Sequence, residues 1–402
     1  MDKQTNGMLQ NRYWKDNGCP ICGSKDINDF YQVNDMPTQA GILFPSIETA
    51  REAPVGDISL AFCQACSYIG NQLHNPAIQN HRVNQFSLQH SPSFRRYAEA
   101  LAQSMIDRFD IRNKTVMDIG CGDGDFLRTL CRLGNNKGIG IDPGFQMKDR
   151  YKDEALDIEY FQDYFSEKYA GYKADFYLCR HVLNVIDDAR AFVSMLRNAI
   201  GDRPGVYLYL EEPDAAYNFG DGIVWNIVYE HRTWFSRESM HNLFTLCGFE
   251  TVELASCWNN EYISITSRPA SQAAASPPLP ASENMKSLLS RVSHEFGQVV
   301  SQWESRMQTL RASGKKIAAW GAGARCITFL NTFDLRDLIS FVIDINPDRQ
   351  GLYIPRDGHR VVAPEHLLLE RPDVILITNP TYAEEIMAHA RQLGCDCEFI
   401  SL

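Results

Sequence analysis

The stretch Thr115-Val-Met-Asp-Ile-Gly-Cys-Gly-Asp-Gly-Asp-Phe126 decides the fold of this chain. A short apolar run, Val116 to Ile119, ends in three glycines at alternate positions, Gly120, Gly122 and Gly124. A helical spacing of apolar residues follows. A strand that runs through a glycine loop into a helix brings the backbone of an α/β sheet close to a nucleotide. Glycine suits this loop because it tolerates unusual φ/ψ angles and has no side chain to block a ligand.

The acids around the loop indicate which nucleotide derivative it binds. Dinucleotide sites carry Gly-x-Gly-x-x-Gly and hold a pyrophosphate at the helix N-terminus, which Asp123 and Asp125 would repel. Asp118 precedes the first glycine by two residues, and Asp142 ends the next apolar run, where a carboxylate suits ribose hydroxyls. The pattern resembles motif I of the S-adenosylmethionine methyltransferases, whose cofactor has a ribose and a cationic sulfonium but no phosphate. The alternative is a glycine-rich turn without a ligand.

Length, charge and cysteine content restrict the remaining possibilities. A chain of 402 residues with 44% hydrophobic residues has room for two or three domains. A net charge of −11 argues against nucleic acid as a partner, and no long apolar run or basic amphipathic stretch suggests a membrane. Twelve cysteines, several of them inside apolar patterns, indicate reduced thiols. The first residues lack signal-peptide character, so we expect a cytoplasmic protein.

Two Cys-x-x-Cys pairs, Cys19/Cys22 and Cys63/Cys66, mark an N-terminal segment of residues 1–82. Each pair can place two thiolates on one turn, and two such pairs complete a tetrahedral zinc site. The prolines and glycines between them predict a loop-rich module that depends on its metal. Four thiolates leave no open coordination position, so we expect structural zinc. A redox dithiol and four unrelated core cysteines are the alternatives.

Alternating strand and helix patterns fill residues 83–268. Ser91 and Pro92 predict a helix start that leads into the first strand. The alternation, closed by two consecutive strands, predicts a doubly wound sheet with one antiparallel edge strand, the class I (Rossmann-like) methyltransferase architecture. The expected elements are strands at 175–179, 206–210, 250–255 and 262–266, with helices at 187–199 and 235–247.

Ligands of such sheets bind beyond the carboxyl ends of the strands. Asp163 is a candidate partner for an adenine amino group, with a solvated loop acid as the alternative of equal weight. The predicted cofactor-binding residues are Asp118, Gly120, Cys121, Gly122, Gly124, Phe126, Asp142, Pro143, Asp163, Tyr164, Arg180 and His181.

A second informative segment, Trp225 to Ser236, follows the fifth strand and is placed to fold over the cofactor site. It collects Tyr229, Glu230 and His231 among aromatic residues. Burial by aromatic rings shifts pKa values and excludes water, which helps a general base. The alternative is a helix entry capped by Ser236, with His231 bonded to a backbone carbonyl.

The arrangement resembles the sugar C-methyltransferases that make branched deoxysugars such as mycarose and tetronitrose. In that family a zinc-binding domain precedes a methyltransferase core and a C-terminal domain. The core carries Tyr-His-Glu-His before an aromatic-Phe-Ser, and Val228-Tyr-Glu-His231 followed by Trp234-Phe-Ser236 matches its second half. The resemblance implies that His231 is the base, with Glu230 beside it. We further expect backbone donors or Tyr229 to stabilise the enolate.

The chain departs from this family at two places in the core. The family's first tyrosine falls on Val228, and its His-Val-x-Asp after the fourth strand becomes Val185-Ile-Asp-Asp188. The class of chemistry therefore transfers better than the substrate.

A Pro/Ala/Ser-rich linker, residues 269–283, precedes a C-terminal domain of residues 284–402. Lys316–Arg325 predicts a strand and glycine turn, and Phe341–Asp344 a second strand that ends in an acid. The turn lacks the third glycine of the dinucleotide fingerprint, so alone it is a weak signal. As a block this half is similar to the same family's C-terminal Rossmann-like domain, which implies that it walls the substrate site. Pro355–Gly358 replaces that family's Pro-Gly-Thr loop.

These patterns lead to one preferred function and two alternatives. The preferred hypothesis is S-adenosylmethionine-dependent C-methylation next to a carbonyl of a nucleotide-linked deoxysugar or similar small metabolite, by a monomer or homodimer. An O- or N-methyltransferase of a secondary-metabolite pathway has the same fold. An inactive nucleotide-binding module is the alternative of another class, and intact Asp118, glycine loop and Asp142 argue against it.

Overall fold

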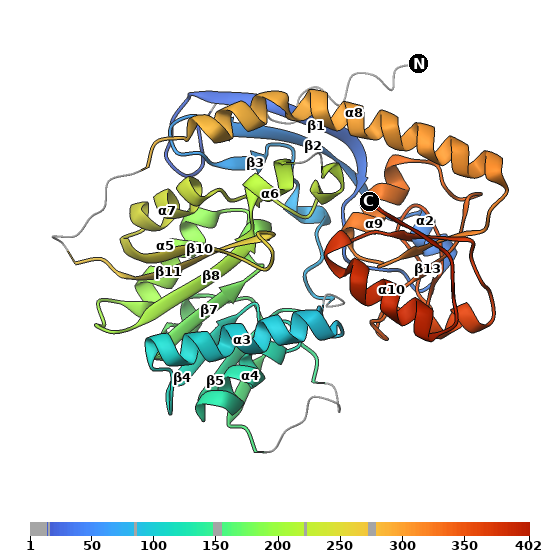
Figure 1. Cartoon of the computed structure of the whole chain (residues 1–402). Coiled ribbons are helices and arrows are strands. Elements are labelled where there is room, and N and C mark those ends of the chain that lie inside the picture. The colour runs from blue at the N-terminus through green and yellow to red at the C-terminus, as the bar shows by residue number, and fades with distance from the viewer. Residues whose placement is uncertain (1–13, 15–16, 84–86, 148–154, 221–222, 272–278) are drawn as a thin grey trace.

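The computed structural model describes residue 14 and residues 17–83, 87–147, 155–220, 223–271 and 279–402. These residues form a four-stranded N-terminal sheet, a seven-stranded central sheet and a five-stranded C-terminal sheet. Figure 1 shows the central and C-terminal sheets side by side, with helix α8 (Glu283–Ser313) running across the top of the molecule. None of the helices in the described residues has the length and apolar character needed to cross a membrane.

The central sheet is doubly wound, as predicted, with the strand order β10-β11-β8-β7-β4-β5-β6. Its strands are β4 (Thr115–Ile119), β5 (Lys137–Ile141), β6 (Ile158–Phe161), β7 (Phe176–Arg180), β8 (Tyr207–Pro213), β10 (Phe249–Cys257) and β11 (Tyr262–Pro269). The predicted antiparallel edge strand is wrong in its position. The antiparallel strand, β11, pairs with both β8 and β10 and so lies inside the sheet. Its middle residues are buried, whereas β10, which lies at the edge, is half-exposed.

Helices cover both faces of the central sheet because successive strand residues point to opposite faces. Val116 packs with α3 (Pro92–Phe109) and α4 (Asp125–Gly134), and Met117 packs with α5 (Ala189–Ile200) and α7 (Arg237–Leu246). Helix α3 begins as predicted, with the Ser91 hydroxyl accepting the Phe94 N–H at 3.2 Å and proline at the first helical position.

The N-terminal sheet is completed by a strand from the middle of the chain. Its order is β1 (Ile27–Pro37), β2 (Val55–Cys63), β3 (Ile69–Asn71) and β9 (Thr233–Trp234). Strand β9 belongs to the aromatic segment that follows β8, and Ile69 pairs with Trp234. Strand pairing therefore joins the first two predicted segments of the chain.

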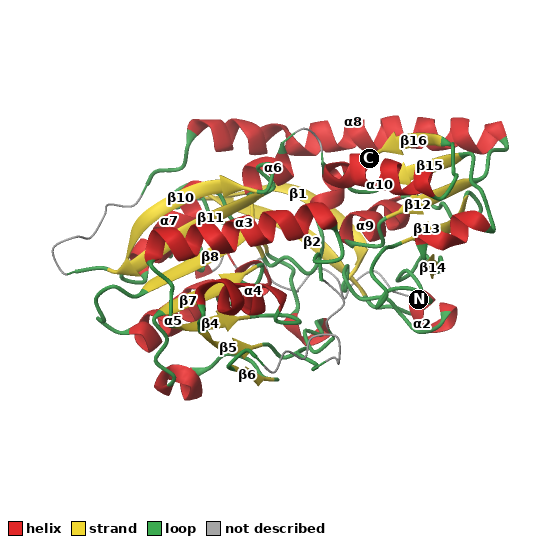
Figure 2. Ribbon diagram, turned by 60° about the horizontal axis from the view of Figure 1, so that its bottom comes forward, coloured by secondary structure: helices red, strands yellow, loops and turns green. Residues whose placement is uncertain are grey.

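Helix α8 joins the N-terminal sheet to the C-terminal domain. Its apolar residues recur at helical spacing, with Met285, Leu289, Val292 and Phe296 buried on one face. Phe296 meets the Tyr31 ring of β1 at 5.2 Å, and the C-terminal half of α8 packs toward the last domain. Figure 2 shows α8 spanning both parts.

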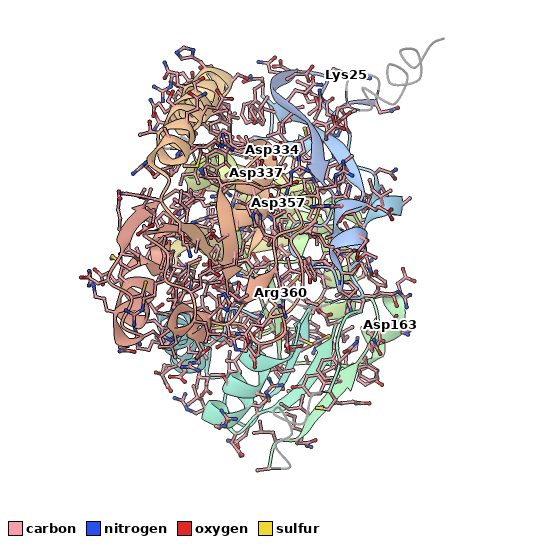
Figure 3. All side chains as sticks on the ribbon, turned by 90° about the vertical axis from the view of Figure 1, so that its right-hand side faces the viewer. Lys25, Asp163, Asp334, Asp337, Asp357 and Arg360 are labelled. Atoms are coloured by element: carbon pink, nitrogen blue, oxygen red, sulfur yellow. The ribbon has the colours of Figure 1, made fainter. Side chains whose placement is uncertain are left out.

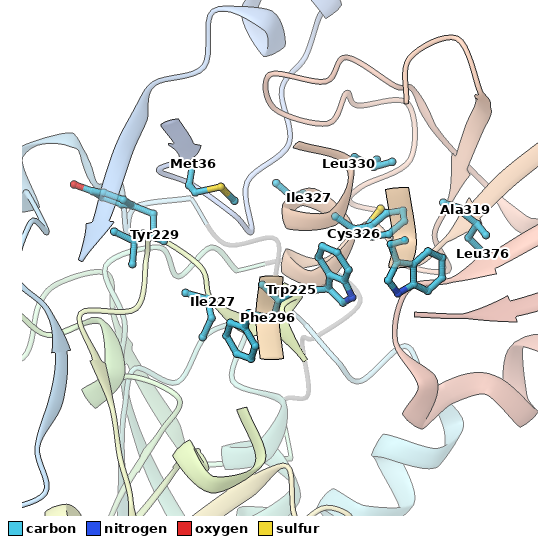
Figure 4. Packing of buried hydrophobic residues seen from close by; sticks show 14 of the residues in the cluster. Met36, Trp225, Ile227, Tyr229, Phe296, Ala319, Cys326, Ile327, Leu330 and Leu376 are labelled. Atoms are coloured by element: carbon cyan, nitrogen blue, oxygen red, sulfur yellow. The ribbon is translucent and has the colours of Figure 1, made fainter. Parts of the chain in front are cut away.

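The C-terminal domain is a smaller parallel sheet with the order β14-β13-β12-β15-β16. Its elements are β12 (Ile317–Trp320), α9 (Ala324–Thr332), β13 (Ile339–Ile343), β14 (Val361–Val362), β15 (Val374–Ile377), α10 (Ala383–Gln392) and β16 (Glu398–Ser401). Trp225 of the central domain packs its ring against Phe329 of α9, with the ring centres 4.9 Å apart. Figure 4 shows Trp225 next to Ile327 and Cys326 of the same helix. A continuous apolar core therefore fixes the C-terminal domain against the rest of the chain.

Candidate active site

A cavity of about 700 Å³ lies where the carboxyl ends of the central and C-terminal strands meet. The glycine loop after β4 lines one side, and the Gly321–Gly323 turn after β12 lines the opposite side. The aromatic segment around His231 and residues 80, 81, 83 and 87–91 complete the wall, within the described parts of the chain. A cavity of this size, with polar and charged side chains set among apolar ones, suits a cofactor and a small substrate.

The glycine loop has the close packing that the sequence predicts. Gly120 has a φ of +72°, and its backbone N–H donates to the Ile141 carbonyl at 2.7 Å. A Cβ atom at Gly120 would lie 2.1 Å from Cγ2 of Val182, so a side chain there is excluded. The loop thus passes directly between β5 and the chain that follows β7, with its backbone on the cavity wall.

Asp142 is held rigidly at the end of β5. Its carboxylate accepts the Gly122 N–H at 2.9 Å and the Gly144 N–H at 2.7 Å. Burial raises its pKa, and these two N–H groups oppose the shift. The carboxylate lines the cavity and keeps lone pairs for sugar hydroxyls. Asp125 in the first turn of α4 makes the helix start unsuited to a pyrophosphate, so the site fits S-adenosylmethionine better than a dinucleotide.

A buried carboxylate, Glu211, positions two side chains of the cavity wall, Arg180 and His181. It accepts hydrogen bonds from Arg180 at 2.6 and 3.0 Å, from Tyr97 at 2.6 Å and from Tyr209 at 2.9 Å. His181 Nε2 lies 3.1 Å from it. Burial would raise the pKa of Glu211, but Arg180 and His181 hold it well below its usual range. The network therefore keeps Arg180 and His181 in place on the cavity wall.

Asp118 faces the same space from β4. Burial raises its pKa to about 7, with the charge of Arg180 opposing the shift and that of Asp142 adding to it. The Arg180 guanidinium in turn lies 4.2 Å from the centre of the Phe126 ring. Acidic groups around this end of the cavity suit a ligand that carries a positive charge.

The structure brings most of the predicted cofactor residues together at the cavity and leaves two outside it. Asp163 accepts hydrogen bonds from the Tyr164 N–H, the Tyr169 hydroxyl and Lys168, and Figure 3 shows it at the outer edge of the molecule. This favours the solvated loop acid over an adenine partner. Gly124 instead starts α4, where a Cβ atom would lie 2.5 Å from the Tyr160 hydroxyl. The residues that line the cavity are Asp118, Gly120, Cys121, Gly122, Phe126, Asp142, Pro143, Tyr164, Arg180 and His181.

His231 lines the cavity with an uncommitted ring. Its Nδ1 atom is buried and has no hydrogen-bond partner among the described residues. The ring meets the edge of Trp234 at 5.6 Å, and Ser236 caps α7 as the alternative interpretation expected. Burial lowers the pKa of His231 to about 4, with a further contribution from His181. The imidazole is therefore neutral at physiological pH and can accept a proton.

The two residues before His231 differ in their placement. Glu230 lines the cavity. Burial raises its pKa to about 7, although the Gly41 N–H and the charge of Arg349 oppose this shift. Tyr229 does not line it. Its hydroxyl accepts the Asn75 N–H at 2.9 Å, and Figure 4 shows the ring pointing away from Trp225 toward the N-terminal strands. We therefore assign Tyr229 no part in the chemistry, because its hydroxyl is committed to the core.

The C-terminal domain repeats the backbone pattern of the Asp142 site. Asp344 at the end of β13 accepts the Ala322 N–H at 2.8 Å and the Asn346 N–H at 2.8 Å. Gly321 has a φ of +103°, and its N–H donates to the Ile343 carbonyl at 2.7 Å. Two carboxylates with the same local geometry therefore face one cavity from opposite domains.

Sequence reasoning missed a polar cluster that links the domains. Arg325 of α9 donates to Asn226 at 2.6 Å, to Asn379 at 2.5 Å and to Glu261 at 2.9 Å. All four residues line the cavity. Arg325 follows the glycine turn and could have been singled out there, but no local pattern marks Glu261 in the β10–β11 hairpin.

The four cysteines of the N-terminal segment form the predicted cluster. Their Sγ atoms lie within 4.8 Å of one another, with Cys19–Cys66 and Cys22–Cys63 both at 3.6 Å and all thiols free. A zinc–sulfur tetrahedron with bonds of ~2.3 Å has sulfurs about 3.8 Å apart, so the cluster fits zinc. Gly23 (φ +78°) turns the chain after the first pair. The cluster lies outside the cavity lining, in keeping with a structural role.

Two family models match the chain. Residues 94–254 match a model described as a methyltransferase domain, and residues 284–400 match one described as a C-methyltransferase C-terminal domain. No curated protein has a significant sequence match to the chain.

Several solved methyltransferase structures match part of the chain. One is the 1,6-didemethyltoxoflavin-N1-methyltransferase of Burkholderia thailandensis, with 11% identity, coverage of 45% of this chain and 82% of that chain, and a TM-score of 0.35. Another is the magnesium protoporphyrin IX methyltransferase of Synechocystis PCC 6803, with 15% identity, coverage of 44% and 84%, and a TM-score of 0.35. Both structures contain S-adenosylhomocysteine.

Proposed function

We propose that this chain, an S-adenosylmethionine-dependent methyltransferase, methylates a carbon next to a carbonyl of a nucleotide-linked deoxysugar or similar small metabolite, with His231 as the base. The observation that carries the proposal is the placement of the neutral His231 ring in one cavity between the glycine loop and a C-methyltransferase C-terminal domain. Bound S-adenosylmethionine supplies an electrophilic methyl group on a sulfonium.

His231 is suited to removing a proton from carbon only when negative charge develops on the substrate during the transfer. A pKa near 4 makes the free imidazole a weak base. An enolate that develops beside the ring favours the imidazolium and raises its pKa during proton transfer. The same low pKa keeps the ring unprotonated, and therefore competent, across the physiological range.

Glu230 supplies a second titratable group on the same wall. Because its pKa is about 7, a substantial fraction is ionised at neutral pH. Both side chains line the cavity, so in this proposal an ionised Glu230 adds a negative charge to the wall on which the imidazolium forms. We therefore assign Glu230 to support of the base.

The cavity walls divide the remaining tasks between the domains. In this proposal Asp142 holds the ribose of the cofactor, and the Gly120–Gly122 backbone faces its amino-acid part. Asp344, with the matching geometry, faces the acceptor from the opposite domain, where a carboxylate suits sugar hydroxyls. Enclosure of both molecules excludes water and brings carbon and methyl into line for transfer.

A deuterium-exchange experiment tests the proposal. The enzyme is loaded with S-adenosylhomocysteine in D₂O and mixed with a thymidine-diphosphate 4-keto-6-deoxyhexose as the probe. NMR then follows loss of the proton next to the carbonyl, with enzyme-free probe as the background. Exchange that requires His231 supports enolate chemistry. No exchange above background, with methyl transferred to oxygen or nitrogen in the turnover reaction, supports the O- or N-methyltransferase alternative instead.

A further inference from the structure

Asn218 carries an unused hydrogen-bond donor at the cavity wall. It lies in the short helix α6 (Ala215–Phe219), is 4% exposed and lines the cavity. Its Nδ2 atom is buried and has no partner within the described ranges of the chain. A buried amide without an acceptor is costly, so such a group points to a ligand that supplies the acceptor.

The direction of the Asn218 amide is set by a chain of hydrogen bonds from the C-terminal domain. Arg325 Nε donates to Asn226 Oδ1 at 2.6 Å, and Asn226 Nδ2 donates to Asn218 Oδ1 at 2.8 Å. A guanidinium can only donate, so Asn226 must turn its oxygen to Arg325 and its NH₂ group to Asn218. Asn218 must then accept this hydrogen bond with its Oδ1 atom. Its own NH₂ group is left without an acceptor among the described residues, on a side chain that lines the cavity.

Arg325, at the start of this chain of hydrogen bonds (the Arg325 relay), is held by residues of both domains. Arg325 also donates to Asn379 of the C-terminal domain and to Glu261 of the β10–β11 hairpin. Because all three guanidinium nitrogens are engaged, Arg325 cannot turn away without breaking several bonds. The Asn218 donor is therefore preorganised before a ligand arrives.

We infer that Asn218 is a specificity-determining residue that donates a hydrogen bond to an oxygen of the methyl acceptor. The inference rests on the proposed function insofar as the cavity holds the acceptor beside the cofactor. The oxygen can belong to a carbonyl, a hydroxyl or a phosphate, all of which accept from an amide. An acceptor without an oxygen at this point leaves the buried NH₂ group unpaired and is discriminated against.

Two isosteric variants test the direction of the amide. Asn218→Asp keeps the acceptor for Asn226 but replaces the donor that faces the ligand by an anionic oxygen. Asn226→Asp leaves Asn218 intact, but its new carboxylate can only accept. Asn218 must then turn its NH₂ group toward position 226 and its oxygen toward the cavity. Asn135→Asp is the control, since it makes the same change of charge at an exposed residue outside the cavity.

Calorimetry with the thymidine-diphosphate 4-keto-6-deoxyhexose probe, on enzyme saturated with S-adenosylhomocysteine, provides the readout. We expect the probe Kd to rise about tenfold or more in both cavity variants and to stay unchanged in the control. The Kd of S-adenosylhomocysteine should be unchanged in all three. Wild-type probe affinity in Asn218→Asp overturns the inference and leaves the proposed function standing.

A probe that fails to bind the wild-type enzyme counts against the proposed acceptor class, and a second measurement then decides the role of Asn218. In a crystal structure of the enzyme with S-adenosylhomocysteine, an Asn218 Nδ2 that faces the cavity or an ordered water in it supports the inference. A protein acceptor on Nδ2 overturns it, because the donor would then be unavailable to any ligand.

Discussion

Glu385 of the C-terminal domain caps helix α3 of the central domain through Ser93. The Glu385 carboxylate accepts the Ser93 N–H at 3.2 Å and the Ser93 hydroxyl at 2.7 Å, and the Ser91 hydroxyl at 3.0 Å. A negative charge at a helix N-terminus satisfies free N–H groups and interacts favourably with the helix dipole. Since Ser91 and Glu385 both line the cavity, this contact helps to hold the two walls together.

Removing this contact should loosen the C-terminal domain. We expect Glu385→Ala to lower the free energy of unfolding by about 1–2 kcal/mol, the usual cost of losing a helix cap. Urea unfolding followed by circular dichroism measures the change. Glu384→Ala is the matched control, because Glu384 is the exposed neighbour on the same helix. Equal stability of the two variants would show that the cap contributes nothing.

The zinc prediction concerns the cysteine cluster. We expect one zinc per chain by metal analysis, and loss of that zinc together with a lower melting temperature in Cys63→Ser, because the metal contributes folding energy. Cys397→Ser alters a cysteine outside the cluster and should retain the metal. A native protein that contains no zinc would rule the site out.

The cofactor prediction compares the two equivalent carboxylates. Asp142→Ala should weaken S-adenosylhomocysteine binding by about 1–3 kcal/mol in calorimetry, since hydrogen bonds to a charged group are lost. Asp344→Ala removes the carboxylate with the same backbone geometry from the opposite domain and should leave this affinity unchanged. The reverse result would mean that the C-terminal domain holds the cofactor.

The catalytic prediction concerns His231 and its pH dependence. His231→Ala should lower kcat by about 10²–10⁴ with nearly unchanged cofactor affinity. Because the pKa of His231 is near 4, its own titration should not limit the rate at neutral pH. Because the pKa of Glu230 is about 7, the activity of the wild-type enzyme should rise with pH through that region. The Glu230→Gln variant should not show this rise. Full turnover in His231→Ala would leave His231 as a packing residue.

A stability prediction follows from the buried pair His359 and Asp357. Burial opposes protonation of His359. Its Nδ1 atom contacts the Asp357 carboxylate, and its Nε2 atom lies 2.6 Å from the Ile339 carbonyl. Both contacts favour the protonated ring, so the pKa of His359 is raised above its usual value. The pair therefore stabilises the fold fully below about pH 6.5 and loses this contribution as pH rises through the folded-state pKa. Melting temperatures of wild type and His359→Gln should converge as pH rises. His366→Gln, a more exposed histidine, should show no such convergence.

The sequence by itself determined the parts of the site that depend on short-range spacing. The glycine loop, Asp142 at the end of its strand and the two cysteine turns follow from a few adjacent residues, because backbone sterics and ligand geometry act locally. Alternating apolar patterns likewise predicted the doubly wound sheet and the C-terminal Rossmann-like unit.

Only the tertiary structure decided which side chains share the cavity. Tyr229 and His231 are two residues apart, yet the first enters the N-terminal core and the second faces the cavity, since β9 joins a sheet formed by the start of the chain. The Arg325 relay to Asn218 spans more than a hundred positions in sequence. Such contacts arise from the packing of three sheets against one another. No local pattern records them, because the partners meet only after each sheet has formed and docked.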